Sequence, residues 1–120
     1  DEAIKYYRAG SWNTRQRPVA QMGIARAEAF AGRAEAALRE GRAALAAQET
    51  LDQFNLSYVR HWFGGVLIAT GRPEEALTQL RQLMTGFGAM TAGEYRHDPL
   101  WSRLKTDPRF EEILQSAKPL

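Results

Sequence analysis

The chain has 120 residues and a formal net charge of +2, with 44% hydrophobic and 25% charged residues. This length fits one domain with a modest core, and the composition is ordinary for a globular protein. No stretch approaches the roughly 18 consecutive apolar residues of a membrane span. So small a charge, spread over both halves, does not favour nucleic-acid binding. The absence of cysteine excludes disulfides and thiolate metal sites.

The N-terminal sequence DEAIKYYRAG is acidic and then polar, so it is not a secretion signal, and we expect a cytoplasmic protein. The chain starts without Met, in what reads as the middle of an element. We therefore interpret it as a piece of a longer protein, with residues 1–17 as the tail of an earlier structural unit and a linker.

Helical periodicity dominates the next part of the chain, and β-branched residues nowhere alternate over six or more positions. The first predicted helix covers Pro18–Ala31, with proline at its start and Gly32 ending it. The second runs from about Ala34 to Gln48 and presents small residues on one face. Another helix can therefore approach this face closely.

Residues 50–55 are predicted to connect this helix to a third one at about Leu56–Thr70. Three residues of the connection are possible helix caps: Thr50, Asp52 and Asn55. Gly64 and Gly65 lie in the middle of the third helix, where each glycine costs about 1 kcal/mol relative to alanine. Keeping both predicts a close backbone contact that a side chain would block.

Gly71 ends the third helix and Pro73 begins a fourth, which is followed by a glycine-rich break at residues 85–94. Two Asp-Pro steps follow, at residues 98–99 and 107–108. Aspartate is a good N-cap and proline a good first helical residue. They predict one short helix to about Leu104 and another to about Ala117.

An internal repeat organises the chain. The sequence GRAEAAL at residues 32–38 returns as GRPEEAL at residues 71–77, with five of seven positions identical, and each copy joins two predicted helices. In each copy the glycine suits a left-handed turn, the glutamate favours the helix dipole, and the alanine allows close packing.

The spacing supports this unit, since Ala3 lies 34 residues before Ala37, which lies 39 residues before Ala76. A helix–turn–helix unit of this length resembles the tetratricopeptide repeat. Small, large and alanine residues fall where that family expects them: Ala25, Ile24 and Ala37 in one copy, and Gly64, Phe63 and Ala76 in the other. The chain departs from the family at Glu28 and Leu67, where an aromatic is usual, and lacks the closing proline.

The resemblance implies an all-α fold, a right-handed superhelix of antiparallel helical hairpins with a short helical C-terminal cap. The expected hairpins are residues 18–50 and 56–88, with capping helices at 94–120, in a single domain of residues 1–120. A stack of hairpins needs such a cap to cover its last apolar face.

The string DPLWSRLKTDPRFEEIL also resembles the tail that follows tetratricopeptide repeats in large bacterial regulators. Those proteins join the repeats to a Ser/Thr protein kinase, a nucleotide-cyclase-like domain or a winged-helix DNA-binding domain. The resemblance implies that this chain is the C-terminal part of such a signalling protein.

Reactive groups are sparsely placed. His61 and His97 belong to no pair with metal-ligand spacing, no Gly-x-Ser-x-Gly elbow is present, and GFGAMTAG lacks the lysine of a phosphate loop. We expect no catalytic, metal or cofactor site. Residues 6–18 interleave arginine with Tyr and Trp, which could hold single-stranded nucleic acid. The favoured interpretation is that these aromatics pack on the next hairpin.

In the tetratricopeptide family the first helix of each unit lines a concave groove that holds partners. Carried over, the groove residues here are Val19, Met22, Arg26, Phe30, Tyr58, His61, Trp62 and Gly65. Aromatic and arginine side chains commonly dominate interface energy. We therefore expect a non-enzymatic module that binds a peptide, another protein or a domain of its own parent. The alternatives are homodimerisation, or a small-molecule sensor pocket between the last hairpin and the cap.

Overall fold

The computed structural model describes residues 2–10, 12, 16–51, 53–85 and 90–116, and every regular element within them is helical. The elements are α1 (Glu2–Ala9), α2 (Arg17–Phe30), α3 (Ala34–Glu49), α4 (Gln53–Ala69), α5 (Pro73–Thr85), α6 (Ala92–His97), the 3₁₀ helix η1 (Trp101–Thr106) and α7 (Pro108–Gln115). The predicted all-α class is confirmed. In the part of the chain so described, no helix combines the length and apolar character needed to cross a bilayer.

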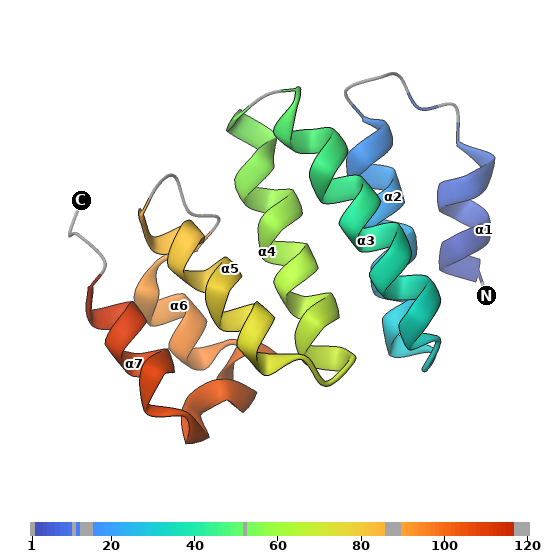
Figure 1. The fold of residues 1–120 in the computed structure, drawn as a ribbon. Coiled ribbons are helices and arrows are strands. Elements are labelled where there is room, and N and C mark those ends of the chain that lie inside the picture. Colours follow the sequence, from blue (N-terminus) through green and yellow to red (C-terminus); the bar gives the residue numbers. More distant parts are fainter. Residues whose placement is uncertain (1, 11, 13–15, 52, 86–89, 117–120) are drawn as a thin grey trace.

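The helices stand in a row, with α1 at one end and the group α6, η1 and α7 at the other (Figure 1). Each of α2 to α5 packs against the helix before it, and α2 also contacts α4. The principal extents are 41 × 30 × 19 Å. The molecule is therefore elongated along the direction in which the helices succeed one another.

The two repeated segments form the same turn. Gly32 and Gly71 have φ angles of 83° and 77°, the left-handed conformation that favours glycine. The N–H of Gly32 donates to the Ala29 carbonyl and that of Arg33 to the Glu28 carbonyl, at 3.1 and 2.9 Å. The equivalent bonds 39 residues later measure 3.1 and 2.8 Å. Both α2 and α4 thus end in a Schellman motif, as the repeat predicted.

Small residues admit aromatic rings between the helices. A Cβ atom at Gly41 of α3 would lie 2.8 Å from Cδ1 of Phe63, so the ring of α4 occupies that space. At Gly64 an added Cβ would overlap the Trp101 ring, and at Gly65 it would approach Leu100 to 3.0 Å. The prediction that these two glycines permit a close contact is confirmed, and the contacting segment is the C-terminal cap.

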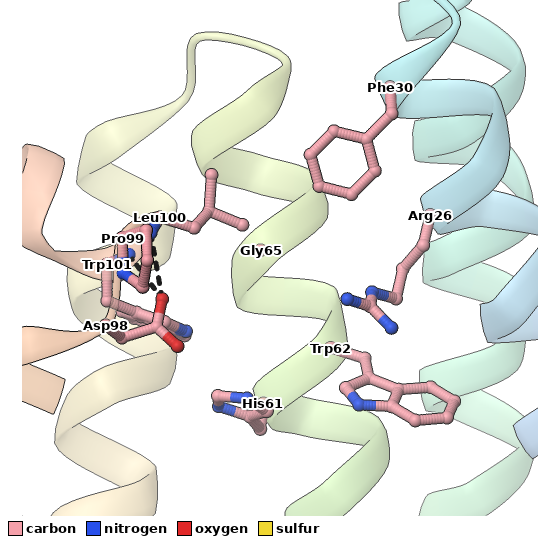
Figure 2. Close-up of a pocket in the computed structure, with 9 residues that line it drawn as sticks. All are labelled: Arg26, Phe30, His61, Trp62, Gly65, Asp98, Pro99, Leu100 and Trp101. Atoms are coloured by element: carbon pink, nitrogen blue, oxygen red, sulfur yellow. Dashed lines mark hydrogen bonds between the residues drawn. The ribbon is translucent and has the colours of Figure 1, made fainter. Parts of the chain in front are cut away.

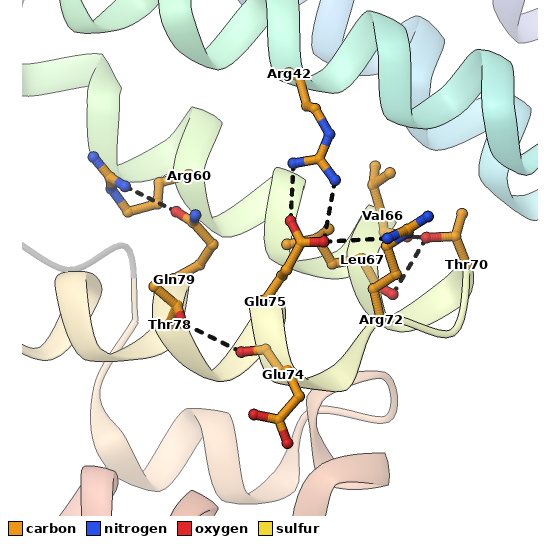
Figure 3. A network of polar contacts seen from close by, with 10 residues as sticks. All are labelled: Arg42, Arg60, Val66, Leu67, Thr70, Arg72, Glu74, Glu75, Thr78 and Gln79. Atoms are coloured by element: carbon orange, nitrogen blue, oxygen red, sulfur yellow. Dashed lines mark hydrogen bonds and ion pairs between the residues drawn. The ribbon is translucent and has the colours of Figure 1, made fainter.

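Ion pairs tie the odd-numbered helices to one another. Arg42 of α3 donates two hydrogen bonds to Glu75 of α5, at 2.8 and 3.1 Å (Figure 3). Arg109 of α7 contacts Glu74 of α5, and Arg8 of α1 lies 3.5 Å from a carboxylate of α3. Apart from the α3 carboxylate that faces Arg8, which is 20% exposed, these side chains are 39–72% exposed, so each pair adds only a small stabilisation.

The C-terminal region corrects several predictions. The predicted break at residues 85–94 does not extend to its end, because Thr91 and Glu94 form a reciprocal capping box that begins α6. The Asp98 carboxylate does accept backbone hydrogen bonds, but the helix that follows is 3₁₀, begins only at Trp101 and has Leu100 at its N-cap position. At the second Asp-Pro step, α7 begins at Pro108 as predicted. The predicted end of α7 at Ala117 and residues 86–89 lie outside the described part of the chain.

The connection before α4 is shorter than predicted. This helix begins at Gln53, so Asn55 lies within it and is not a cap. The hydroxyl of Thr50 donates to the Ala47 carbonyl at the end of α3. Asp52, the third suggested cap, is not among the described residues.

Candidate functional site

A cleft lies where α2 and α4 meet the segment that leads into η1. Its volume is about 170 Å³. The residues that line it are Arg26 and Phe30 of α2, His61, Trp62 and Gly65 of α4, and Asp98, Pro99, Leu100 and Trp101 of the cap (Figure 2). Three segments far apart in sequence therefore form one site.

The opposing walls of the cleft are apolar. Phe30, at the C-terminal end of α2, is 60% exposed although it is a large aromatic residue. Pro99 and Leu100 form the facing wall, and α4 passes between the two walls at Gly65 (Figure 2). Because a Cβ at Gly65 would press on Leu100, the glycine keeps this wall close to α4.

Arg26 and Trp62 also line the cleft, and they contact each other. The guanidinium carbon of Arg26 lies 5.0 Å from the centroid of the Trp62 ring, a cation–π arrangement. Both side chains are half-buried. The contact holds the guanidinium beside the cleft and aligns it with an aromatic face.

An aromatic cluster of His61, Trp101 and Tyr95 packs beside the cleft. Trp101 is buried and stacks on His61 with ring centroids 5.8 Å apart and planes 16° from parallel. Tyr95 of α6 is also buried and meets Trp101 edge-on at 5.0 Å. A hydrogen bond of 2.9 Å joins the Tyr95 hydroxyl to Nδ1 of His61. The cap is therefore attached to α4 by rings as well as by a polar contact.

Burial governs the protonation of this cluster. Desolvation lowers the pKa of His61, the charge of Arg26 lowers it further, and only the carboxylate of Asp98 opposes the shift. The imidazole is therefore mainly neutral at pH 7. Desolvation likewise raises the pKa of the Tyr95 phenol well above its usual value, so that this group remains protonated. The charges that line the cleft are then those of Arg26 and Asp98.

Asp98 fixes the wall of the cleft that Pro99 and Leu100 form. Its Oδ1 accepts hydrogen bonds from the backbone N–H groups of Leu100 and Trp101, at 2.9 and 3.0 Å (Figure 2). These bonds hold the chain as it turns into η1. The same carboxylate places a negative charge opposite Arg26.

Five of the eight residues predicted to line a groove surround this cleft: Arg26, Phe30, His61, Trp62 and Gly65. The structure places the other three elsewhere. Met22 is completely buried among core side chains, which corrects its placement on a groove, since no partner can reach it. Val19 is partly buried against the same core. Tyr58 is 50% exposed but does not line the cleft.

Four residues of the C-terminal cap, which form the other half of the site, were not predicted as site residues from the sequence. The Asp98-Pro99 step predicts a helix start but does not indicate that this segment folds against α4. The paired glycines in α4 predicted a close neighbour, and that neighbour supplies Leu100 and Trp101.

The cleft presents apolar surface together with the charged side chains of Arg26 and Asp98. Among residues 2–10, 12, 16–51, 53–85 and 90–116, no group of three or more His, Asp or Glu side chains is arranged to hold a metal ion. The imidazole of His61 is held by Tyr95 and Trp101. What the geometry supports is binding of a group that combines apolar and charged surface.

No protein-family model, curated protein or solved structure matches the chain. Its function is therefore inferred from the geometry of the cleft.

Proposed function

We propose that the chain is a non-enzymatic, tetratricopeptide-like interaction module of a cytoplasmic regulator, which binds a peptide segment of a partner in the cleft. The partner is another protein or another domain of its own parent. The observation that carries this proposal is the exposure of Phe30, 60% accessible, in the same cleft as the Arg26–Trp62 pair.

These residue types support a binding role. Aromatic and arginine side chains supply most of the energy at protein interfaces, because each buries a large area and also makes directional contacts. A single exposed aromatic is ordinary on a protein surface. Here Phe30, Trp62 and Arg26 line one concavity with the apolar cap residues.

The size of the cleft favours a peptide side chain. Small-molecule sites commonly enclose about 300–1,000 Å³, whereas this cleft encloses about 170 Å³. One side chain fits such a volume, and the rest of a peptide can then cross the surface of α2 and α4. The walls are fixed by buried Trp101 and by Asp98, so binding requires little ordering of the protein.

A small-molecule sensor is the second candidate. It is favoured by the position of the cleft, which lies where a helical pair meets the C-terminal cap. A compound bound there would contact both and strengthen their association. Its size would be that of a single metabolite fragment rather than a nucleotide or cofactor.

Phe30→Ala is expected to weaken peptide binding tenfold or more, since it removes the exposed wall of the cleft. The measurement is titration calorimetry on the 120-residue chain, with peptides selected on it from a displayed random library. Tyr6→Ala is the matched control, because Tyr6 is 67% exposed on α1, at the far end of the row (Figure 1). Failure to select any peptide, or equal loss in both variants, would contradict the proposal. Stabilisation by a metabolite set, abolished in Phe30→Ala alone, would favour the sensor.

A further inference from the structure

Four arginines of the described chain are half-buried, and three of them are neutralised or hydrogen-bonded by a neighbouring element. Arg60 donates to the Gln79 side chain at 2.8 Å, Arg96 to the Glu111 carboxylate at 2.9 Å, and Arg109 to the Glu74 carboxylate at 2.8 Å. Arg26 is the fourth. Among the described residues its guanidinium has the Trp62 ring as neighbour and no carboxylate or amide acceptor.

The arrangement of Arg26 suits an incoming carboxylate. A guanidinium carries five N–H donors in a planar fork that matches the two oxygens of a carboxylate. The guanidinium carbon lies 5.0 Å from the centroid of the Trp62 ring, a contact that does not use the N–H donors, so they remain available to an acceptor. Half-burial lowers the local dielectric, which makes a charge-assisted bond there stronger than on an open surface.

The opposite wall sets the direction in which such a ligand binds. Asp98 carries a negative charge on the cap side, only partly compensated by its two backbone N–H donors. A second carboxylate is disfavoured near it, whereas Leu100 and Pro99 accept an apolar group. His61 contributes no opposing positive charge at pH 7, since burial lowers its pKa.

We propose that the peptide bound by the cleft is acidic at a defined place: an Asp or Glu side chain pairs with Arg26, and an adjacent large apolar side chain enters between Phe30 and Leu100. This inference rests on the proposed function, because it specifies the chemistry of the peptide that occupies the same site. The partner is a protein segment whose carboxylate supplies the acceptor that Arg26 lacks.

The test begins with a random dodecapeptide library displayed on phage and selected on the 120-residue chain at low ionic strength. Asp or Glu next to an aromatic or large aliphatic residue is the expected enrichment. One selected peptide is then synthesised with its Glu and with Gln in that place. Wild-type protein is expected to bind the Glu peptide about tenfold or more tightly than the Gln peptide, and the difference should shrink as salt is added.

Substitutions at Arg26 separate the charge effect from loss of structure. Arg26→Gln should bind the two peptides equally, and Arg26→Glu should prefer a third peptide that carries Lys at the same place. Arg39→Gln makes the same change of charge on an exposed arginine of α3 and should keep the wild-type preference. Arg26→Lys retains the positive charge and should retain part of the preference. Circular dichroism melts check that each variant is folded.

The outcomes distinguish the two proposals. Peptides that require Phe30 but show no acidic preference, or whose Glu preference survives in Arg26→Gln, would overturn this inference and leave the proposed function standing. Selection of no peptide, or of peptides indifferent to Phe30→Ala, would overturn both. Loss of the preference in Arg39→Gln to the same extent as in Arg26→Gln would also contradict it, because the effect would then come from net charge alone.

Discussion

The helical pairs α2–α3 and α4–α5 share a turn but differ in how their interiors are filled. Positions 39 residues apart correspond, so Gly41 and Ala44 of α3 match Leu80 and Leu83 of α5. All four are buried. Gly41 leaves room for the ring of Phe63, which belongs to α4 of the following pair. In α5 the leucines fill the equivalent space themselves.

The two first helices show the converse difference. Ala25 of α2 corresponds to Gly64 of α4, where a Cβ atom would overlap the Trp101 ring of the C-terminal cap. A turn can be copied from one unit to the next because its hydrogen bonds are local. Packing cannot be copied in this way, because each unit meets a different neighbour on its outer side.

The polar contacts within the two helical pairs are equivalent, as the turns are, whereas the packing of their cores differs. The Gln21 amide of α2 donates to Glu40 of α3 at 3.1 Å. The Arg60 guanidinium of α4 donates to Gln79 of α5 at 2.8 Å, as Figure 3 shows. These contacts occupy equivalent positions, with the donor on the first helix in both. Geometry is conserved between the units while the residue types change.

Gly64→Ala is expected to destabilise the protein by about 1–3 kcal/mol, because its Cβ would overlap the buried Trp101 ring. This result opposes helix propensity, which favours alanine by about 1 kcal/mol. In a Trp101→Ala background the overlap is gone, so adding Gly64→Ala should stabilise that variant. Denaturant unfolding of the four proteins measures both steps. A stabilising Gly64→Ala in the wild-type background would show that α4 and the cap are not packed this closely.

The two turns provide a matched test of local equivalence. Gly32→Ala and Gly71→Ala should each destabilise the protein by about 1 kcal/mol, since both positions have positive φ. Nothing lies within 4 Å of an added Cβ at either site, so the effect comes from the backbone alone. Thermal and urea unfolding should give values that agree within about 0.5 kcal/mol. A much larger effect at one site would mean that the two turns are not equivalent.

The same distinction explains what the sequence could predict. Gly32 and Gly71 predicted the turns because a left-handed residue has a local signature, and helical periodicity placed α2 to α5 within a few residues. Gly64 predicted a close neighbour, but nothing local identified that neighbour as Trp101. Thr91 and Glu94 have the spacing of a capping box, but the glycines before them indicate a break rather than a helix start.

The candidate site was half predictable for a related reason. Arg26 and Trp62 fall on the first helices of the repeat, so the resemblance placed them on one face. Met22 lies on α2 one turn before Arg26, yet its side chain is completely buried in the core. Asp98 and Leu100 depend on where the cap folds back, and this is a long-range contact without a periodic signal.

The smallest expected effect concerns the ion pair that joins the two helical pairs. Hydrogen bonds from Arg42 lower the pKa of Glu75. Burial opposes this shift, and the charges of Arg42 and Arg72 add to it. When the pKa of a carboxyl group is lower in the folded than in the unfolded state, its full stabilising effect is present at a pH above the unfolded pKa, which is about 4.3 for glutamate. This stabilisation is lost as the pH falls through the folded pKa. Glu75→Gln should therefore cost a few tenths of a kcal/mol at pH 7, because the pair is well exposed.

The difference between Glu75→Gln and wild type should vanish as the pH falls through the lowered folded pKa of Glu75, where its carboxylate becomes protonated. Urea unfolding at a series of pH values measures it. Glu35 is the control, since it occupies the position in the first unit that corresponds to Glu74, and its exposed side chain forms no ion pair within the described residues. Glu35→Gln should have little effect at either pH. A pH-independent cost of Glu75→Gln would show that the side chain acts by packing, and that the charge between α3 and α5 contributes nothing.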